Sequence, residues 1–337
     1  MIDYTAFERD IRATARKWLE SGEVELVIGY EKTDDSPVAR PAFIRSPEDT
    51  DRLYWGPDCV SNLTLYLVEE MKKKPAKKGE KPFTYAVGIV VKPCDSKAIV
   101  ELMKENMVPR ERVRIIGVAG GESINPKKLD EVLSKRPTDN RKNIRFADAD
   151  ENYIIKYNGG ELSVPKKDLE ADKCKVCVTH RAVIADVFVG KIDEPPRPDN
   201  FEDIKHLEEM SEEDRWKYWE AQFSKCVRCY ACRNACPLCY CEECVFDREK
   251  PYRWVEKSVQ LRENTFYHLV RAMHLAGRCI DCGECERVCP MDIPIRELNR
   301  FLIKRAKERF KVFSGMEKDD KPMFGTYDTD DPGEEIW

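Results

Sequence analysis

The spacing of apolar residues predicts that residues 1–190 alternate between helices and strands. Apolar side chains recur every three or four positions over 4–20 and 61–72, as expected for helices with one buried face. Short apolar runs typical of strands lie at 24–30, 38–44, 85–91 and 113–118. The order strand, helix, strand over 85–118 predicts a β-α-β unit. The fold class expected for this part is therefore α/β, with a parallel or mixed sheet.

Capping and turn residues mark the ends of several predicted elements. Asp95 or Ser96 can cap a helix over 97–105, because short polar side chains accept hydrogen bonds from the free N–H groups of a first turn. Another helix is expected to start at Pro126, since proline suits the first helical position. The Asn-Gly-Gly turn at 158–160 lies between two apolar runs and predicts a hairpin.

The pattern changes after residue 190. Residues 191–215 combine prolines with an acidic stretch and predict a linker that ends where a helix starts. Residues 216–310 are rich in cysteine and contain a helical segment over 258–277. Residues 311–337 are polar, contain Gly and Pro, and predict an extended tail.

Two runs of cysteine share the spacing C-x2-C-x2-C-x3-C-P. They are Cys226-Val-Arg-Cys229-Tyr-Ala-Cys232-Arg-Asn-Ala-Cys236-Pro237 and Cys279-Ile-Asp-Cys282-Gly-Glu-Cys285-Glu-Arg-Val-Cys289-Pro290. Bacterial ferredoxins with two [4Fe–4S] clusters have this spacing, and the fourth cysteine of each run binds the other cluster. Residues 216–310 are therefore predicted to form an α-rich, two-cluster, ferredoxin-like C-terminal domain. One cluster is assigned to Cys226, Cys229, Cys232 and Cys289, and the other to Cys279, Cys282, Cys285 and Cys236.

Three other cysteine chemistries fit this pattern less well. Zinc sites favour two separated CxxC pairs around a tetrahedral ion. A disulfide framework suits short chains in an oxidising compartment, whereas this chain has 337 residues and no signal-peptide pattern. The spacing Cys232-x3-Cys236-x2-Cys239 matches a radical-SAM site, but it overlaps a complete ferredoxin run and no barrel-like series follows it.

Seven cysteines lie outside the eight assigned positions. Four of them belong to the α/β part: Cys59, Cys94, Cys174 and Cys177. Four thiolates can hold one more [4Fe–4S] cluster. Cys59 and Cys94 each precede a predicted helix, whose free N–H groups favour an anionic cluster. The alternatives are that Cys59 and Cys94 are small buried residues, or that Cys94 is a reactive thiol.

The last three cysteines are Cys239, Cys241 and Cys244, which are spaced too closely for ordinary core residues. They suggest a fourth cluster with three cysteine ligands and one other ligand. Extra thiols packed beside the neighbouring cluster are the alternative, and both interpretations stay open. His268 and His274 are predicted to be packing or surface residues, since a six-residue spacing does not place them on one helix face.

Composition narrows the classes of function. The chain is long enough for two or three domains, and its net charge of −5 gives no indication of nucleic acid as a partner. No apolar stretch reaches the length of a membrane span, so the protein is not expected to span a membrane. Fifteen cysteines without a leader predict a reducing cytoplasm, and oxygen-sensitive clusters suit an anaerobe. The basic segment from Lys72 to Lys81 reads as a solvated loop or as a docking patch, and the tail is a second candidate docking segment.

Three segments of residues 20–190 carry a resemblance to a known family. They are Glu20-Ser-Gly-Glu-Val-Glu-Leu-Val-Ile-Gly29, Val91-Lys-Pro-Cys94-Asp-Ser-Lys-Ala98, and Cys174-Lys-Val-Cys177 with the downstream Ala185-Asp-Val-Phe-Val-Gly190. In these segments the chain resembles the beta-subunit family of deazaflavin-dependent hydrogenases and formate dehydrogenases. The resemblance covers most of the chain. That family often carries its ferredoxin module at the N-terminus, whereas here the module is C-terminal.

The resemblance implies a flavin, usually FAD, beside a cluster in the α/β domain. A flavin can accept a hydride and release single electrons. The chain would then be the electron-transfer beta subunit of an oxidoreductase complex. It would pass electrons between a hydride carrier, or a catalytic subunit that oxidises formate or hydrogen, and a heterodisulfide-reductase-like or ferredoxin partner.

Two departures from the family motif favour an alternative function. The chain has Gly56-Pro57-Asp58-Cys59 and Val178-Thr179-His180 where family members often have a Gly-Ser-Lys-Tyr-like turn and an Asp-Phe-Thr-like segment. A flavin-free adaptor that wires two partners together, with no catalytic site of its own, is consistent with both changes. A binding or sensing protein with structural clusters is a third class. It is disfavoured because three or more clusters form a path for electrons.

Overall fold

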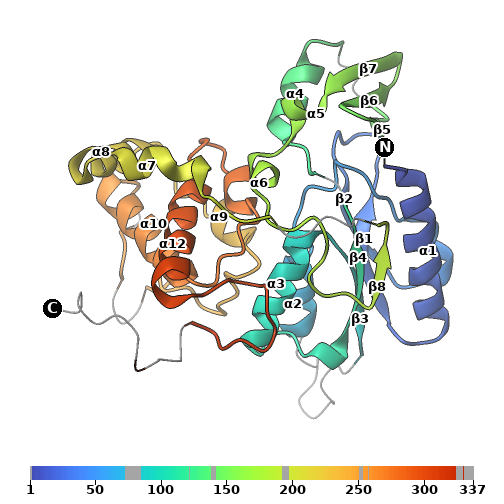
Figure 1. The fold of residues 1–337 in the computed structure, drawn as a ribbon, viewed down its shortest axis with the longest axis horizontal. Helices are drawn as coiled ribbons and strands as arrows, with labels where there is room; N and C mark the ends of the chain where they lie inside the picture. The colour runs from blue at the N-terminus through green and yellow to red at the C-terminus, as the bar shows by residue number, and fades with distance from the viewer. Residues whose placement is uncertain are drawn as a thin grey trace. The chain divides into compact units, whose positions relative to one another are not determined.

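The structure is a computed structural model, and it describes residues 2–72, 85–120, 122–137, 142–191, 197–249, 253–256, 258–323 and 329. The chain divides into two compact units (Figure 1). Unit 1 contains Met1–Ile99 and Asn106–Asp199, and unit 2 contains Val100–Glu105 and Asn200–Trp337. Most of the basic segment, predicted as a solvated loop or a docking patch, and the end of the tail, a candidate docking segment, lie outside the described residues.

A five-stranded sheet with the order β2-β1-β3-β4-β8 forms the centre of unit 1. Strand β2 (Arg40–Ile44) pairs antiparallel with β1 (Leu26–Glu31). Strands β1, β3 (Val87–Val91), β4 (Val113–Val118) and β8 (Val187–Val189) pair in parallel. Every residue of β3 is buried, as expected for a central parallel strand. Of the two sheet types that were predicted, parallel or mixed, the sheet is mixed.

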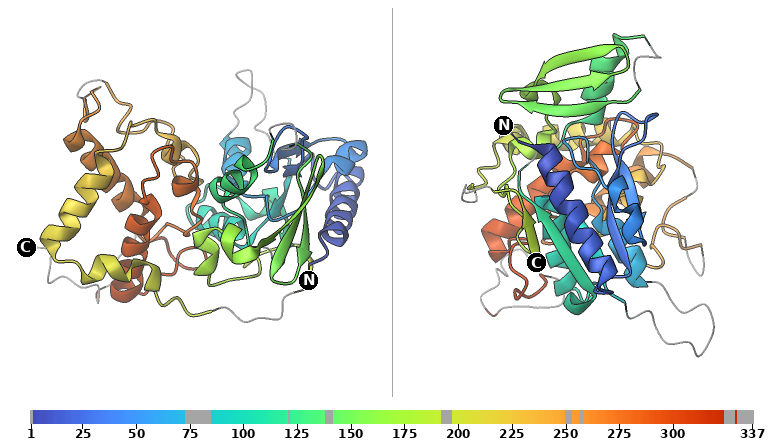
Figure 2. Two further views of the ribbon diagram at one scale, coloured as in Figure 1. Left: turned by 90° about the horizontal axis from the view of Figure 1, so that it is seen from above. Right: turned by 90° about the vertical axis from the view of Figure 1, so that its right-hand side faces the viewer.

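Three helices cover this sheet. Helix α1 (Tyr4–Glu20) lies on one side, and α2 (Thr64–Lys72) and α3 (Pro93–Lys104) lie on the other (Figures 1 and 2). Helix α1 has the predicted bounds, because Asp3 accepts a hydrogen bond from the Ala6 N–H at 3.0 Å and caps the first turn. Its buried face includes Ile11 and Trp18.

The predicted start of helix α3 is wrong, because the helix begins at Pro93 and not at residue 97. Asp95 and Ser96 were expected to precede the first turn of this helix, but they lie inside it. Proline is tolerated at the first helical position, where no N–H partner is needed. The Asp95 carboxylate reaches back to accept the Lys92 N–H at 3.0 Å, which is the return half of a capping box.

A smaller antiparallel sheet lies beyond one end of the five-stranded sheet in unit 1 (Figure 2). It contains β5 (Arg145–Ala149), β6 (Asn152–Tyr157) and β7 (Gly160–Pro165) in sequence order. The predicted hairpin is the β6–β7 connection, where Tyr157 pairs with Gly160. Helix α4 (Pro126–Ser134) starts at the predicted proline and packs Leu129 and Leu133 against this sheet. Helices α5 (Lys166–Leu169) and α6 (Asp172–Lys175) follow β7.

The described part of unit 2 is helical and contains no strand. The longer helices are α8 (Glu212–Phe223), α10 (Leu261–Leu275) and α12 (Ile295–Phe310). The short ones are α7 (Lys205–Glu209), α9 (Ala231–Asn234) and α11 (Glu284–Arg287). No helix in the described ranges is long and apolar enough to cross a membrane.

The stretch predicted as a linker contains helical turns. Residues Glu202–Ile204 form a 3-10 turn that leads into α7. Ile204 and Leu207 are fully buried in a cluster that also contains Phe223. Burying these apolar side chains against α8 is more favourable than leaving them exposed on an extended linker. The segment therefore forms helical turns.

Candidate functional site

Both cysteine runs of unit 2 fold into the same loop. The third and fifth positions of the runs have left-handed backbone angles: Arg228 and Tyr230 in the first run, Asp281 and Gly283 in the second, with φ between 50° and 68°. The Arg228 N–H donates to the Cys226 sulfur at 3.3 Å. The Asp281 N–H makes the equivalent contact and lowers the pKa of Cys279. This repeated turn aims backbone donors at cysteine sulfurs, a geometry that stabilises anionic ligands.

The fourth cysteine of each run affects the pKa of thiols in the other run: Cys289 acts on Cys226, and Cys236 acts on Cys279 and Cys285. Burial raises the pKa of Cys226, and the thiols of Cys232, Cys289 and Cys229 raise it further. Cys289 comes from the second run. We name the set Cys226, Cys229, Cys232 and Cys289 the first cysteine group.

The reverse exchange occurs around Cys279. Burial raises its pKa to about 12, with Asp281 and the Cys236 thiol of the first run adding to the increase. Burial also raises the pKa of Cys285, whose neighbours include Cys279 and Cys236. We name the set Cys279, Cys282, Cys285 and Cys236 the second cysteine group. Most thiols of both groups are buried, and only Cys229 is exposed.

Arg271 of α10 lies between the two cysteine groups and was not identified from the sequence. Its side chain is 5% exposed, and its Nη2 donates to the Cys232 carbonyl at 3.0 Å. Burial alone would lower its pKa. The neighbouring thiols raise it well above its ordinary value, and they include Cys236, Cys285 and Cys232. The sequence held one signal for this role. The helix that lies between the two cysteine runs along the chain contains an arginine.

The two histidines of α10 differ. His268 is buried and stacks on Phe223 with a centroid distance of 4.7 Å, and burial lowers its pKa to about 4. His274 is exposed. His268 is therefore the predicted packing residue, and His274 is a surface residue.

Three of the four predicted cysteines of unit 1 lie together. Cys94 is in the first turn of α3, Cys174 is in α6, and Cys177 follows α6. Burial raises the pKa of Cys94 to about 12, and the Cys177 thiol contributes to this increase. Burial also raises the pKa of Cys174, whose sulfur accepts the Ser123 N–H at 3.3 Å.

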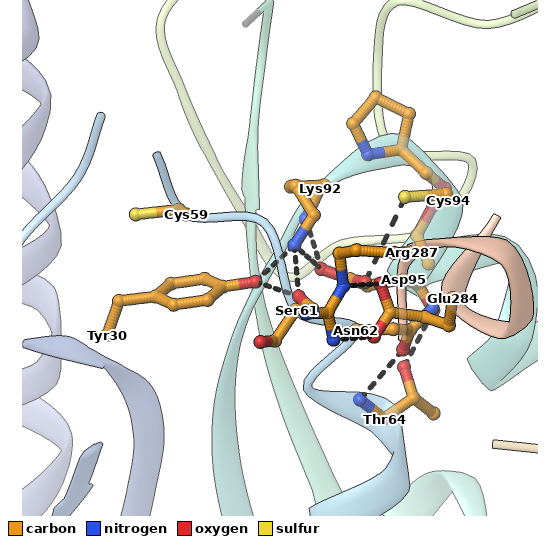
Figure 3. A network of polar contacts seen from close by, with 12 residues as sticks. Tyr30, Cys59, Ser61, Asn62, Thr64, Lys92, Cys94, Asp95, Glu284 and Arg287 are labelled. Atoms are coloured by element: carbon orange, nitrogen blue, oxygen red, sulfur yellow. Dashed lines mark hydrogen bonds and ion pairs between the residues drawn. The ribbon is translucent and has the colours of Figure 1, made fainter. Parts of the chain in front are cut away.

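Cys59 stands apart from these three. Figure 3 shows Cys59 and Cys94 on opposite sides of Lys92, which influences the pKa of both thiols. Cys59 is 1% exposed, and burial together with Asp58 raises its pKa well above the ordinary value. The structure thus brings Cys94, Cys174 and Cys177 together and places Cys59 beyond a lysine side chain.

Lys92 is the centre of a buried polar network at the end of β3 (Figure 3). Its Nζ donates to the Tyr30 hydroxyl and, at 2.6 Å, to the Ser61 carbonyl. It also lies 3.0 Å from an Asp95 carboxylate oxygen. Sequence reasoning missed this residue. A polar residue directly after a buried parallel strand is a usable signal, because ligands of α/β sheets bind at the carboxyl ends of strands.

A second buried ion pair lies beside Cys59. Lys32 pairs with Asp58, and both side chains are at most 2% exposed. The Tyr54 hydroxyl donates to the other Asp58 oxygen at 2.7 Å, and Lys32 also donates to the Pro37 carbonyl at 2.8 Å. The buried charges of Lys32 and Asp58 therefore have their partners within unit 1.

Among the described residues, no three side chains of His, Cys, Asp or Glu form a group that could hold a single metal ion. A four-iron cluster makes a different demand on its ligands, because each thiolate binds a separate iron and the thiolates stand farther apart. The converging buried thiols and the N–H donors of the two loops are the donor set that such a cluster requires.

Two family models match this chain. Residues 85–216 match the model that describes the C terminus of the beta subunit of coenzyme F420 hydrogenase/dehydrogenase. Residues 222–293 match the 4Fe–4S dicluster domain. The first match contains Cys94, Cys174 and Cys177, and the second contains both cysteine groups and the Cys239–Cys244 segment.

Curated relatives are similar to most of the chain. The F420-dependent formate dehydrogenase subunit beta of Methanocaldococcus jannaschii is 24% identical over 291 residues, which cover 71% of this chain and 76% of that protein. The F420-dependent formate dehydrogenase 1 subunit beta of Methanococcus maripaludis is 24% identical over 371 residues, which cover 94% of this chain and 92% of that protein.

A solved structure also matches. A chain of the F420-reducing [NiFe] hydrogenase complex from Methanosarcina barkeri aligns with a TM-score of 0.43 and 18% identity, covering 57% of this chain and 68% of that one. The family models agree with the motifs in both units. Residues 85–216 therefore match the C-terminal region of the beta subunits of coenzyme F420 hydrogenases and dehydrogenases, and residues 222–293 match a 4Fe–4S dicluster domain.

Proposed function

We propose that the chain is the iron–sulfur electron-transfer subunit of an F420-dependent formate dehydrogenase or hydrogenase complex. The observation that carries this proposal is the exchange of Cys236 and Cys289 between two cysteine groups, within a segment that matches a dicluster domain. The match of residues 85–216 to the beta-subunit family supports the F420-linked role. The activity would belong to the complex, to which this chain contributes the electron path.

Each cysteine group would hold one [4Fe–4S] cluster, which supplies one-electron redox chemistry when bound. The protein's own part is to fix the thiolates and shield them from water. Buried Cys232 and Cys285 provide the shielding, and the N–H groups of Arg228 and Asp281 stabilise negative charge on sulfur.

Unit 1 would hold a third cluster at Cys94, Cys174 and Cys177, with Cys59 as the proposed fourth ligand. The three grouped thiols support this assignment. Cys59 would have to pass the Lys92 side chain to reach them, so we expect it to contribute least to iron binding. FAD is the proposed further cofactor of this unit, and it would supply hydride chemistry towards reduced coenzyme F420 when bound; the family match supports this proposal.

A flavin-free adaptor is the second candidate. It is favoured by the closed network of Lys32, Asp58 and Tyr54, which fills the turn before Cys59 with mutually paired side chains. In either case we propose cytoplasmic partners: a catalytic subunit that oxidises formate or hydrogen, and a heterodisulfide-reductase-like or ferredoxin acceptor.

The test is cofactor analysis of the full chain purified without oxygen. Iron, acid-labile sulfide and extractable flavin are counted per chain. We expect at least about twelve irons, four for each of three clusters, and one flavin. Fewer than about eight irons would overturn the electron-transfer proposal. At least about twelve irons without flavin would favour the adaptor.

A second measurement separates the two candidates further. Reduced coenzyme F420 is mixed with the purified chain, and cluster reduction is followed by electron paramagnetic resonance. Reduction of the clusters by the coenzyme supports the flavin-containing form. Clusters that dithionite reduces but the coenzyme does not would leave the adaptor as the function.

A further inference from the structure

A cavity of about 510 Å³ in unit 2 contains the three cysteines that neither cysteine group uses. Cys239, Cys241 and Cys244 line it together with Arg233, Arg271 and Arg278. We name it the arginine-lined cavity. Its walls combine three nucleophilic thiols with three cations that keep their charge at any physiological pH.

The arginines lie next to the thiols. Arg271 is within hydrogen-bonding reach of Cys239, and Arg233 is within reach of Cys244. Arg278 also interacts electrostatically with Cys239. The three arginines therefore give the cavity a positively charged wall, which favours an anionic group.

Two of these arginines are held in place by other side chains. Arg233 makes two hydrogen bonds of 2.8 Å to Asp247 and lies over the Tyr230 ring at 4.5 Å. Arg278 pairs with Glu105, with Nη2 2.7 Å from a carboxylate oxygen. Their guanidinium groups are fixed at the wall before any ligand arrives, which lowers the entropy lost on binding.

Arg271 lines this cavity and also lies beside both cysteine groups. Its side chain is 5% exposed, and its Nε has no hydrogen-bond partner in the described part of the chain. A buried, unsatisfied guanidinium N–H is costly, so it needs a compensating acceptor. An anionic group inside the cavity, or one held by the adjacent cysteine groups, would provide one.

A single metal ion does not fit the three thiols, because they are not part of any described group that could hold one ion. The same is true of the two cysteine groups assigned to four-iron clusters. Thiolates that bind separate irons of one cluster stand apart, and a thiolate-bound cluster is anionic, which matches the arginine wall.

We propose that the arginine-lined cavity holds a further iron–sulfur cluster bound by Cys239, Cys241 and Cys244. One iron would have no cysteine ligand, and His274 and Asp247 line the same cavity. This inference deepens the proposed function, because it adds a cluster to the same electron-transfer unit.

The test is a double variant of the full chain, Cys241→Ser with Cys244→Ser, purified without oxygen beside the wild type. We expect the variant to lose about four irons and the matching sulfide per chain. The resonance signals of the two ferredoxin-type clusters should remain, which shows that unit 2 is still folded. The matched control is Glu243→Gln, an exposed residue of the same loop that does not line the cavity, and its iron content should equal that of the wild type.

Several outcomes would overturn the inference. They are an unchanged iron count in the double variant, the loss of one zinc in place of iron, or a disulfide among the three cysteines in the wild type. If the double variant loses the ferredoxin-type signals as well, a His274→Ala variant decides. A changed spectrum of the additional cluster with unchanged ferredoxin-type signals supports the site, and no spectral change contradicts it.

The inference and the proposed function can fail separately. A wild-type chain without ferredoxin-type clusters would contradict the proposed function. A wild-type chain that keeps those clusters, with a double variant that loses no iron, would contradict only the additional cluster.

Discussion

The cysteines of the two units are organised in different ways. In unit 2 the ligands come from a repeated motif, and both copies adopt one left-handed turn that directs N–H groups to sulfur. In unit 1 the cysteines come from separate elements, and Lys92 lies between Cys59 and Cys94. In a repeated local motif, the sequence of a few residues determines where the ligands lie. The positions of scattered ligands depend on how distant segments pack.

The buried cations beside the cysteines also differ. Lys32 and Lys92 of unit 1 are paired with buried carboxylates, so their charges are compensated within the protein. Arg271 of unit 2 lies among thiols, and its Nε has no partner among the described residues. A paired lysine stabilises the fold, whereas an arginine that faces thiols can stabilise the negative charge of a bound cluster.

The largest expected effect comes from removing one ligand in each unit. Cys232→Ser should lower iron by about four per chain and abolish the resonance signal of one unit 2 cluster, because a buried ligand has no substitute nearby. Cys177→Ser should remove the unit 1 cluster, and Cys59→Ser should remove less iron than Cys177→Ser. Iron analysis of the three variants is the measurement. Equal loss in Cys59→Ser and Cys177→Ser would mean that Cys59 is a full ligand and that the contrast between the units is smaller than the structure indicates.

The next effect is on the stability of unit 1. Lys92→Met leaves the fully buried Asp95 without its cation, and we expect a loss of about 3–5 kcal/mol in the free energy of unfolding. Urea unfolding followed by circular dichroism measures it. Lys97→Met, in helix α3 directly after Lys92, is the matched control and should change stability by less than about 0.5 kcal/mol. A Lys92→Met loss as small as that of the control would show that the network is not structural.

A pH effect is expected from His268 in unit 2. Its pKa is about 4 in the folded chain and about 6.5 when exposed, so the unfolded chain binds the proton more readily. Stability is therefore complete above pH 6.5 and falls as the pH drops towards 4, by about 2 kcal/mol at pH 5. Denaturant titrations at pH 7.5 and pH 5 measure this loss. In His268→Phe, which keeps a ring against Phe223, this part of the pH dependence should disappear. An identical pH dependence in the variant would contradict the assignment.

Arg271 should affect cluster potentials. Arg271→Gln removes a positive charge beside both cysteine groups, which makes the reduced clusters less favourable. We expect midpoint potentials to become more negative by on the order of 50–100 mV, from one charge at effective dielectric 20. Arg271→Lys keeps the charge and should shift them less. Redox titration followed by electron paramagnetic resonance measures the shift, and equal shifts in both variants would indicate a packing effect.

The smallest effect compares the two loops directly. Gly283 and Tyr230 occupy equivalent left-handed positions, with φ of 68° and 60°. Gly283→Ala should cost about 1 kcal/mol in the free energy of unfolding, because a Cβ disfavours this backbone region. Denaturant unfolding of the intact holoprotein provides the measurement. Stability equal to the wild type would indicate that the second loop tolerates a side chain as the first does.

Local features were the most predictable from the sequence. Helix α1 has the predicted bounds, α4 starts at the predicted proline, and the hairpin forms at the Asn-Gly-Gly turn. Each depends on a few neighbouring residues: a cap, a proline or a turn. The first residue of α3 was less predictable, because Pro93 and Asp95 are both compatible with a helix start and only the hydrogen bond to the Lys92 N–H decides between them.

The sequence by itself determined the mixed α/β and helical organisation, and it indicated which cysteines belong to the repeated motif, since periodicity and motif spacing are local properties of the chain. Tertiary structure decided where Cys59 lies relative to Lys92, and it placed Arg271 between two cysteine groups and the three remaining cysteines in one cavity. These contacts join residues that are far apart along the chain, and their formation depends on packing and burial, which no short window of sequence contains.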